Sequence, residues 1–532
     1  MILLKQNYET YNTDLRTMIQ AFFPGIKIVE ELNEEPLFTL SAVYDESRTY
    51  VSIDSFSEEL GNSVIRDDSF FSEDKTLDFF GNIVPVKESG ASFVSKLVIF
   101  DNYLDKENFR NEMKYATYKL LCTFTGRTLP WGDMTGVRPT KIALGMLADK
   151  NAVDCGDVCV DKNAVDCGDG CVDAVVRHYQ DMYGVSERKA KLATMVAKNE
   201  LCLVKDIELD NSYSLYVGIP FCPSRCLYCS FTAYPIASYK NLSVDYVDYL
   251  CKEISEVAKQ NKDKKLTSIY VGGGTPTAIS HELLDKLLAH INDTFEINDG
   301  KILEFTVEAG RPDSITMEKL VVMKNRGVSR ISINPQTMND ETLKTIGRAH
   351  NSMQIKEAFA MARELGFDNI NMDLIAGLPG ENVESMRHTL QELRKLDPES
   401  ITVHSLAIKR AANLNQQMSD FKNEINHETD EMLNLVSDIT NELGMHPYYL
   451  YRQKNIGGNL ENVGYSKPGK ECYYNVLIME ELQSIVACGA GTVTKRVFPD
   501  GHIERCDNVK DVKLYIDKFD EMLERKRTLF AD

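Results

Sequence analysis

The sequence comprises 532 residues, of which 43% are hydrophobic and 26% charged, and its formal net charge is −20. A single core seldom serves so long a chain, so we expect two or three domains. The acidic balance disfavours a nucleic-acid partner and favours a small-molecule substrate. No apolar run reaches the roughly eighteen residues of a membrane span, and the opening residues lack the features of a signal peptide. We therefore expect a cytoplasmic protein without stable membrane insertion.

Residues 1–205 mix strand-like and helix-like segments, which predicts an α+β domain of unassigned purpose. Within it, DKNAVDCGDVCV (149–160) is followed at once by DKNAVDCGDGCV (161–172). This tandem repeat carries two CxxxC pairs, and four thiolates would suit a second metal site: Cys155, Cys159, Cys167 and Cys171. The repeat is also acidic and lacks apolar periodicity, so we favour a loop insertion over 149–172.

Residues 206–410 alternate short β-branched or aromatic runs with longer amphipathic segments, the pattern of parallel strands joined by crossover helices. The fold class predicted here is α/β, a partial (β/α)6 barrel. Chemistry in such barrels lies at the carboxyl ends of the strands. The six expected strands are 214–219, 268–273, 303–309, 329–334, 369–377 and 399–406.

Residues 411–532 are predicted to form a third, C-terminal domain. It begins with the helix-like segment HETDEMLNLVSDITNELG, whose apolar residues recur at three- and four-residue spacing. We interpret this region as a cap that packs across the open side of the barrel.

Three cysteines follow the first expected strand in the segment LYVGIPFCPSRCLYCSF: Cys222, Cys226 and Cys229. Their CxxxCxxC spacing can aim three thiolates at one 4Fe-4S cluster and leave one iron open, as a catalytic metal site requires. The alternatives are a zinc site or three incidental buried cysteines. Zinc normally takes a fourth Cys or His, and none lies in this loop. The spacing therefore favours the cluster.

Small and polar residues lie near the ends of the later strands. The segment YVGGGTPTAI places Gly272, Gly273 and Gly274 after the second strand, where a missing side chain lets a ligand approach the backbone. Thr275 follows with a hydroxyl. Further polar candidates come near the ends of the next strands: Glu308, Gln336, Arg348 and Asp373. Each feature alone is also compatible with an ordinary turn or a structural polar group.

The cysteine spacing, the aromatic Tyr228 between the last two cysteines, and the glycine run on the next strand resemble the radical S-adenosylmethionine (SAM) superfamily over residues 213–410. The resemblance implies a 4Fe-4S cluster and SAM as cofactors, with SAM cleaved to a 5'-deoxyadenosyl radical that abstracts a substrate hydrogen. Arg348 suits the SAM carboxylate because its fork donates two hydrogen bonds. The implied cofactor contacts are Tyr216, Tyr228, Gly273, Gly274, Thr275, Glu308, Gln336, Arg348, Asp373 and Ala407.

The order Glu, Gln, Arg, Asp resembles the oxygen-independent coproporphyrinogen III oxidase-like branch of that superfamily. The flanking segments FTGRTLPWGDMTGVRPTKI and YLYRQKNIGGNLENVGYSKPG look like those of coproporphyrinogen dehydrogenases of the HemZ type. This implies oxidative decarboxylation of coproporphyrinogen III to protoporphyrinogen IX in haem biosynthesis, with an electron donor to the cluster and a separate electron acceptor. Candidate anchors for the substrate carboxylates, each equally interpretable as a solvated surface charge, are Arg452, Lys454, Lys409 and Arg410.

Two departures from the branch are visible. The segment AGRPD follows Glu308 where many relatives have Asp-Pro or Asn-Pro, and Ser230-Phe231 follows the cluster motif where oxidases of the branch carry a further cysteine. The second departure resembles the haem chaperones, so a haem-binding chaperone or a haem-modifying radical SAM methyltransferase stays the alternative function. Haem would need a His, Cys or Tyr ligand, for which the candidates are His404, Tyr451, Cys472 and Tyr473.

Overall fold

The computed structural model describes residues 1–7, 9–31, 35–44, 48–55, 75–77, 83–85, 94–101, 106–136, 138–148, 169–229, 233–297, 302–406, 425–453 and 459–531. These residues divide into two compact units. The first comprises Met1–Pro139, Met146–Thr194 and Arg452–Leu460. The second comprises Thr140–Gly145, Met195–Tyr451 and Glu461–Asp532. The division into three domains expected from the sequence, 1–205, 206–410 and 411–532, stays a prediction.

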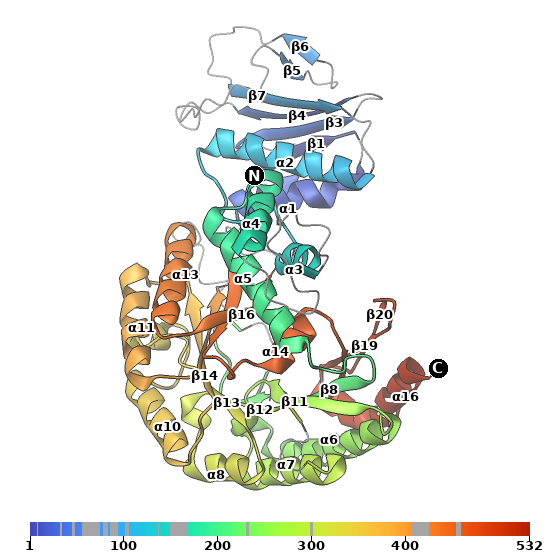
Figure 1. Cartoon of the computed structure of the whole chain (residues 1–532), viewed down its shortest axis with the longest axis vertical. Helices are drawn as coiled ribbons and strands as arrows, with labels where there is room; N and C mark the ends of the chain where they lie inside the picture. Colours follow the sequence, from blue (N-terminus) through green and yellow to red (C-terminus); the bar gives the residue numbers. More distant parts are fainter. Residues whose placement is uncertain are drawn as a thin grey trace. The chain divides into compact units, whose positions relative to one another are not determined.

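The first unit is built on a five-stranded sheet in the order β2-β1-β3-β4-β7 (Figure 1). Strand β1 runs parallel to β2 and β3, whereas β3, β4 and β7 are antiparallel. Helices α1 and α2 bury apolar residues such as Met18 and Leu121 against Leu40 and Val51 of the sheet, an α+β arrangement. The bounds are β1 (Ile2–Gln6), α1 (Asn12–Phe22), β2 (Ile28–Val29), β3 (Thr39–Tyr44), β4 (Arg48–Ser55), β7 (Val94–Asp101), α2 (Lys106–Thr125) and α4 (Asp169–Tyr183). The residues of α3 (Thr140–Ala148) and α5 (Glu187–Val204) are divided between the two units.

The tandem repeat falls almost wholly outside the described residues. Only its last four residues, from Asp169 to Val172, are described, and they form the start of α4. The loop insertion and the alternative second metal site therefore both stay predictions.

The second unit contains an eleven-stranded sheet in the order β16-β17-β15-β14-β13-β12-β11-β8-β18-β19-β20. Its six central strands are parallel neighbours that follow one another in chain order, which confirms the predicted partial (β/α)6 barrel. The barrel stays open because β8 pairs with β18 and β15 with β17 instead of with each other. The six strands are β8 (Ser212–Ile219), β11 (Lys265–Gly273), β12 (Glu304–Gly310), β13 (Arg330–Ile333), β14 (Ile370–Ala376) and β15 (Ser400–Ser405).

The crossover helices form an arc outside the strands (Figure 1). Side-chain caps fix where several of them begin: the Ser280 hydroxyl accepts from the Leu283 amide ahead of α7, and Asn351 and Gln354 form a capping box ahead of α10. The helices are α6 (Lys240–Gln260), α7 (His281–Phe295), α8 (Met317–Asn325), α9 (Asp340–Thr345), α10 (Ser352–Glu364) and α11 (Val383–Leu396). None of the described helices is long and apolar enough to cross a membrane.

The C-terminal residues extend this same sheet at both ends. Strand β17 pairs antiparallel with β15, while β18 pairs parallel with β8 and continues into β19 and β20. The region predicted to be a separate cap thus shares a sheet with the core. Its elements are α13 (Ile425–Glu442), β16 (His446–Arg452), β17 (Glu461–Ser466), α14 (Tyr473–Met479), β18 (Ser484–Cys488), β19 (Val493–Val497), β20 (Ile503–Asp507), α15 (Val512–Asp517) and α16 (Phe519–Phe530).

Candidate functional site

The cysteine loop begins beyond the carboxyl end of β8. Cys222 closes the short strand β9 (Phe221–Cys222), and Cys226 is buried. The Cys229 amide donates to the Cys226 carbonyl at 3.2 Å, and the Leu227 amide donates to the Ile346 carbonyl at 3.1 Å. These backbone bonds fold the CxxxCxxC segment into a compact turn at the strand ends.

The glycine run meets the cysteine loop directly. The amides of Gly274 and Thr275 donate to the carbonyls of Ile219 and Phe221, both at 2.7 Å. A Cβ on Gly274 would lie 2.6 Å from the Phe221 carbonyl oxygen and 3.1 Å from Cys222 Sγ. Only glycine therefore permits this close approach without a shift of the backbone.

Burial and neighbouring sulfurs shape the chemistry of the loop. The pKa of the Cys222 thiol is raised to about 11, chiefly by burial and also by the nearby Cys229 and Cys226, while Thr275 opposes the shift because its hydroxyl lies 3.4 Å from Cys222 Sγ. Such thiols bind metal as thiolates, so iron would take the place of their protons. In the described part of the chain, no three His, Cys, Asp or Glu side chains converge as the ligands of a single ion do. In a 4Fe-4S cluster, by contrast, each thiolate binds a different iron.

Glu308 lies on β12, beside the glycine run on β11. Its Oε1 accepts a hydrogen bond of 2.6 Å from the Tyr270 hydroxyl, and burial raises the pKa of its carboxyl group to about 7. A Cβ on Gly272 would lie 3.0 Å from the Glu308 carboxyl carbon. Asp373, on β14, is a nearby negative charge that contributes to the raised pKa of Glu308. The structure thus brings two of the predicted carboxylates to one region between the strands.

Gln336 and Arg348 come from the segments that follow β13. Gln336 is buried at a φ of 69°, and its backbone bonds to β14 through the Asp373 carbonyl and the Ile375 amide. Arg348 is buried, and its Nη2 donates to the Tyr228 hydroxyl at 2.7 Å. Its Nη1 donates to a backbone carbonyl, while its buried Nε has no hydrogen-bond partner. The structure therefore joins Arg348 to the aromatic residue of the cysteine motif.

The remaining predicted cofactor contacts are Tyr216 and Ala407. Tyr216 on β8 is partly buried, and its ring stacks on those of Tyr270 and Tyr474 at centroid distances of 6.1 and 6.0 Å. Its hydroxyl would lie 3.5 Å from a Cβ on Gly273. Ala407 lies outside the described residues.

Of the four predicted substrate anchors, only Arg452 lies within the described residues. Arg452 is buried in the first unit, where its Nε donates to the Gly136 carbonyl at 2.9 Å and its guanidinium lies over the Trp131 ring. Arg452 therefore holds a segment of its own unit together and is not an exposed anchor. The other three anchors, Lys409, Arg410 and Lys454, lie outside the described residues.

Two of the candidate haem ligands lie side by side. Tyr451 and His404 touch, with 3.4 Å between the hydroxyl and Nδ1. Cys472 is fully buried in a hydrophobic cluster against which Tyr451 packs, and its Sγ donates to Glu304 Oε1 at 3.2 Å.

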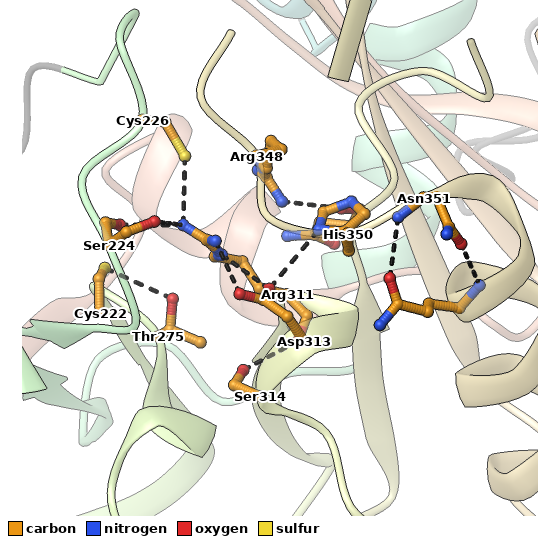
Figure 2. A network of polar contacts seen from close by, with 12 residues as sticks. Cys222, Ser224, Cys226, Thr275, Arg311, Asp313, Ser314, Arg348, His350 and Asn351 are labelled. Atoms are coloured by element: carbon orange, nitrogen blue, oxygen red, sulfur yellow. Dashed lines mark hydrogen bonds and ion pairs between the residues drawn. The ribbon is translucent and has the colours of Figure 1, made fainter. Parts of the chain in front are cut away.

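One polar network was missed in the sequence. Arg311 and Asp313, from the AGRPD segment after β12, lie with His350 beside the cysteine loop (Figure 2). The segment AGRPD could have pointed to this network, because it departs from the Asp-Pro or Asn-Pro that many relatives carry there.

Residues 216–393 match the family described as the radical SAM superfamily. The chain is 39% identical to the oxygen-independent coproporphyrinogen-III oxidase-like protein HemZ of Bacillus subtilis, over 83% of this chain and 84% of that protein. It is 33% identical to the heme chaperone HemW of B. subtilis, over 57% of this chain and 75% of that protein. The solved structure of coproporphyrinogen III oxidase (HemN) from Escherichia coli aligns with a TM-score of 0.46 and 21% identity, covering 59% of this chain and 70% of that one.

Proposed function

This chain belongs to the radical SAM superfamily and, within it, to the oxygen-independent coproporphyrinogen-III oxidase-like proteins of the HemZ type, and on that premise we propose that it converts coproporphyrinogen III to protoporphyrinogen IX. The superfamily uses a 4Fe-4S cluster and SAM as cofactors. When bound, these groups supply a carbon-centred radical that removes a hydrogen from a propionate side chain. The propionate then loses carbon dioxide and one electron to become a vinyl group, and the electron passes to a separate acceptor.

The observation that carries the proposal is the junction of the cysteine loop with the turn after β11. Gly274 packs so closely against the cysteine loop that a Cβ would lie 3.1 Å from Cys222 Sγ, and the Thr275 hydroxyl lies 3.4 Å from the same sulfur. Three buried or half-buried thiols at the carboxyl ends of parallel strands are a donor set that fits an iron-sulfur cluster. We assign the cluster to Cys222, Cys226 and Cys229.

We assign SAM to the strand ends next to that loop. The buried Arg348 has an Nε donor without a hydrogen-bond partner, which suits a carboxylate. Gly273 and Gly274 are the proposed contacts to the SAM amino group, since neither carries a side chain that would keep a ligand from the backbone. Glu308, Gln336 and Asp373 are the proposed polar contacts to the rest of SAM, with Tyr216, Tyr228, Thr275 and Ala407 around it.

The aromatic residues inside the barrel would keep water from the reacting groups. Tyr216, Tyr270 and Tyr474 stack on one another, and the Tyr270 and Tyr474 rings lie 4.6 Å apart. A dry interior protects a reactive radical from side reactions. Glu308 holds the Tyr270 hydroxyl in place at 2.6 Å.

The test is an anaerobic reaction with reduced, cluster-loaded protein, SAM, an electron acceptor and coproporphyrinogen III. We expect the tetrapyrrole to lose the mass of two carbon dioxide molecules, as followed by mass spectrometry. A protein in which Cys226 is replaced by Ala serves as the control and should leave the substrate unchanged. SAM cleavage without that mass loss would contradict the proposed substrate.

A second candidate function is haem delivery, which is favoured by the similarity to a protein named as a heme chaperone. In that case haem should bind tightly to the protein and transfer to an apo-acceptor, with no change in its mass. Haem titration followed by absorbance, alongside the decarboxylation assay, separates the two functions.

A further inference from the structure

The AGRPD segment folds into a buried network directly behind the cysteine loop. Arg311 follows β12, and only 3% of its surface is exposed. Its Nε and Nη2 donate to the two carboxylate oxygens of Asp313 at 2.9 and 2.8 Å. His350 faces the same carboxylate, with Nδ1 3.5 Å from Oδ1. The carboxylate therefore fixes the plane of the guanidinium group.

The remaining nitrogen of Arg311 points into the cysteine loop (Figure 2). Nη1 donates to the carbonyl and the hydroxyl of Ser224 at 2.9 and 3.0 Å, and it lies 3.6 Å from Cys226 Sγ. Hydrogen bonds to sulfur are longer than those to oxygen, so the last contact is within bonding range. Asp313 thus aims one N–H group of Arg311 at a proposed cluster ligand.

We propose that Arg311 is a positioning residue that sets the reduction potential of the cluster, an inference that rests on the proposed assignment of the cluster to Cys222, Cys226 and Cys229. Reduction adds one negative charge to a cluster and its thiolates. A cationic N–H donor on a ligand sulfur stabilises that charge, and hydrogen bonds to the sulfurs are among the factors that set cluster potentials. Arg311 therefore makes the cluster easier to reduce, which the first electron transfer to SAM requires.

The experiment compares Arg311→Gln with Arg326→Gln in the full chain. Arg326 is a matched control because it makes the same two-pronged contact with an aspartate, Asp285, at 2.7 and 2.9 Å on the helical outside of the barrel. Iron per chain is measured first, and the midpoint potential is then measured by redox titration followed by electron paramagnetic resonance. We expect Arg311→Gln to lower the equilibrium constant for reduction about tenfold, which is about 59 mV for one electron. Arg326→Gln should match the unmodified protein.

A second variant should shift the midpoint potential of the cluster in the opposite direction. Asp313→Asn removes the negative charge while the Ser224 carbonyl and hydroxyl still hold Nη1 of Arg311, so the midpoint should move to a more positive potential. A general loosening of the loop would not move the two variants in opposite directions. If Arg311→Gln assembles no cluster, Asp313→Asn alone decides the question, and the absence of a positive shift overturns the proposal.

Iron content and midpoint potential test the cluster site and the role of Arg311 separately. If Cys226→Ala keeps its full iron content, the proposed cluster site is wrong. If Cys226→Ala loses its iron while Arg311→Gln keeps a cluster with the same midpoint as Arg326→Gln, the cluster site stands and the role of Arg311 is refuted.

Discussion

At the scale of single residues, the proposed cluster site depends on three cysteine sulfur atoms. Cys222, Cys226 and Cys229 lie in one turn, whereas Cys251 is buried on α6. Because thiolate is the iron ligand, we expect Cys222→Ala, Cys226→Ala and Cys229→Ala each to abolish the cluster, as measured by iron content and by visible absorbance. Cys251→Ala is the matched control and should keep its iron. Retention of a full cluster in all three variants would contradict the assignment.

Arg348 is the residue for which SAM binding can be separated from cluster assembly. Its guanidinium donates hydrogen bonds to Tyr228 and a backbone carbonyl, and Cys226 acts on it electrostatically. We expect Arg348→Ala to weaken SAM binding by about 1.5–3 kcal/mol, the contribution of a charged hydrogen bond, with iron content unchanged. Anaerobic calorimetry measures the affinity. Arg363→Ala, on the outer helix α10, is the control, and equal SAM affinity in the two variants would rule out the role given to Arg348.

Between elements, the critical contact is the turn after β11 against β9. A Cβ on Gly274 would lie 2.6 Å from the Phe221 carbonyl oxygen, a backbone atom that cannot rotate away. We expect Gly274→Ala to displace β9, to reduce the iron bound per chain and to destabilise the fold by about 1–3 kcal/mol, as overpacking does. Gly145→Ala is the control, because a Cβ there has no atom within 4 Å. Normal iron content in Gly274→Ala would show that the contact is not needed.

The central strands and crossover helices were the part of the fold that the sequence predicted best. Each central strand is a short apolar run and each crossover helix an amphipathic segment, so residues close in sequence carry the signal. The cysteine and glycine motifs fall at the ends of the first two of these strands, which makes their meeting predictable from parallel order alone. The burial of Arg452 was not predicted, because a charged side chain gives no local sign that it will be buried.

For the molecule as a whole, the second unit depends on a buried charge pair between distant segments. Glu253 on α6 accepts from the Tyr515 hydroxyl and the Gly489 amide at 2.6 and 2.7 Å, and it pairs with Lys526 on α16. The Lys526 and Glu253 side chains are 1% and 0% exposed. This pair therefore ties the C-terminal helix to the barrel.

Removing one partner should be costly because the other charge stays buried. We expect Lys526→Met to lower the free energy of unfolding by about 3–5 kcal/mol, as measured by urea denaturation. The exposed pair of Lys513 and Asp517 provides the control, since Lys513→Met should change little. A double variant with Glu253→Gln should recover part of the loss. If Lys526→Met were no less stable than Lys513→Met, the pair would not anchor α16.

The sequence by itself determined the six βα units, the CxxxCxxC loop and the glycine run, because spacing and periodicity along the chain encode them. Only the tertiary structure decided that β17 and β18 extend the sheet at opposite ends. It alone brought Arg311 to Cys226, 85 residues away, and Lys526 to Glu253, 273 residues away. The physical reason is that such contacts depend on which strands become neighbours. That order is set by the burial of the whole sheet and by no local segment of the chain.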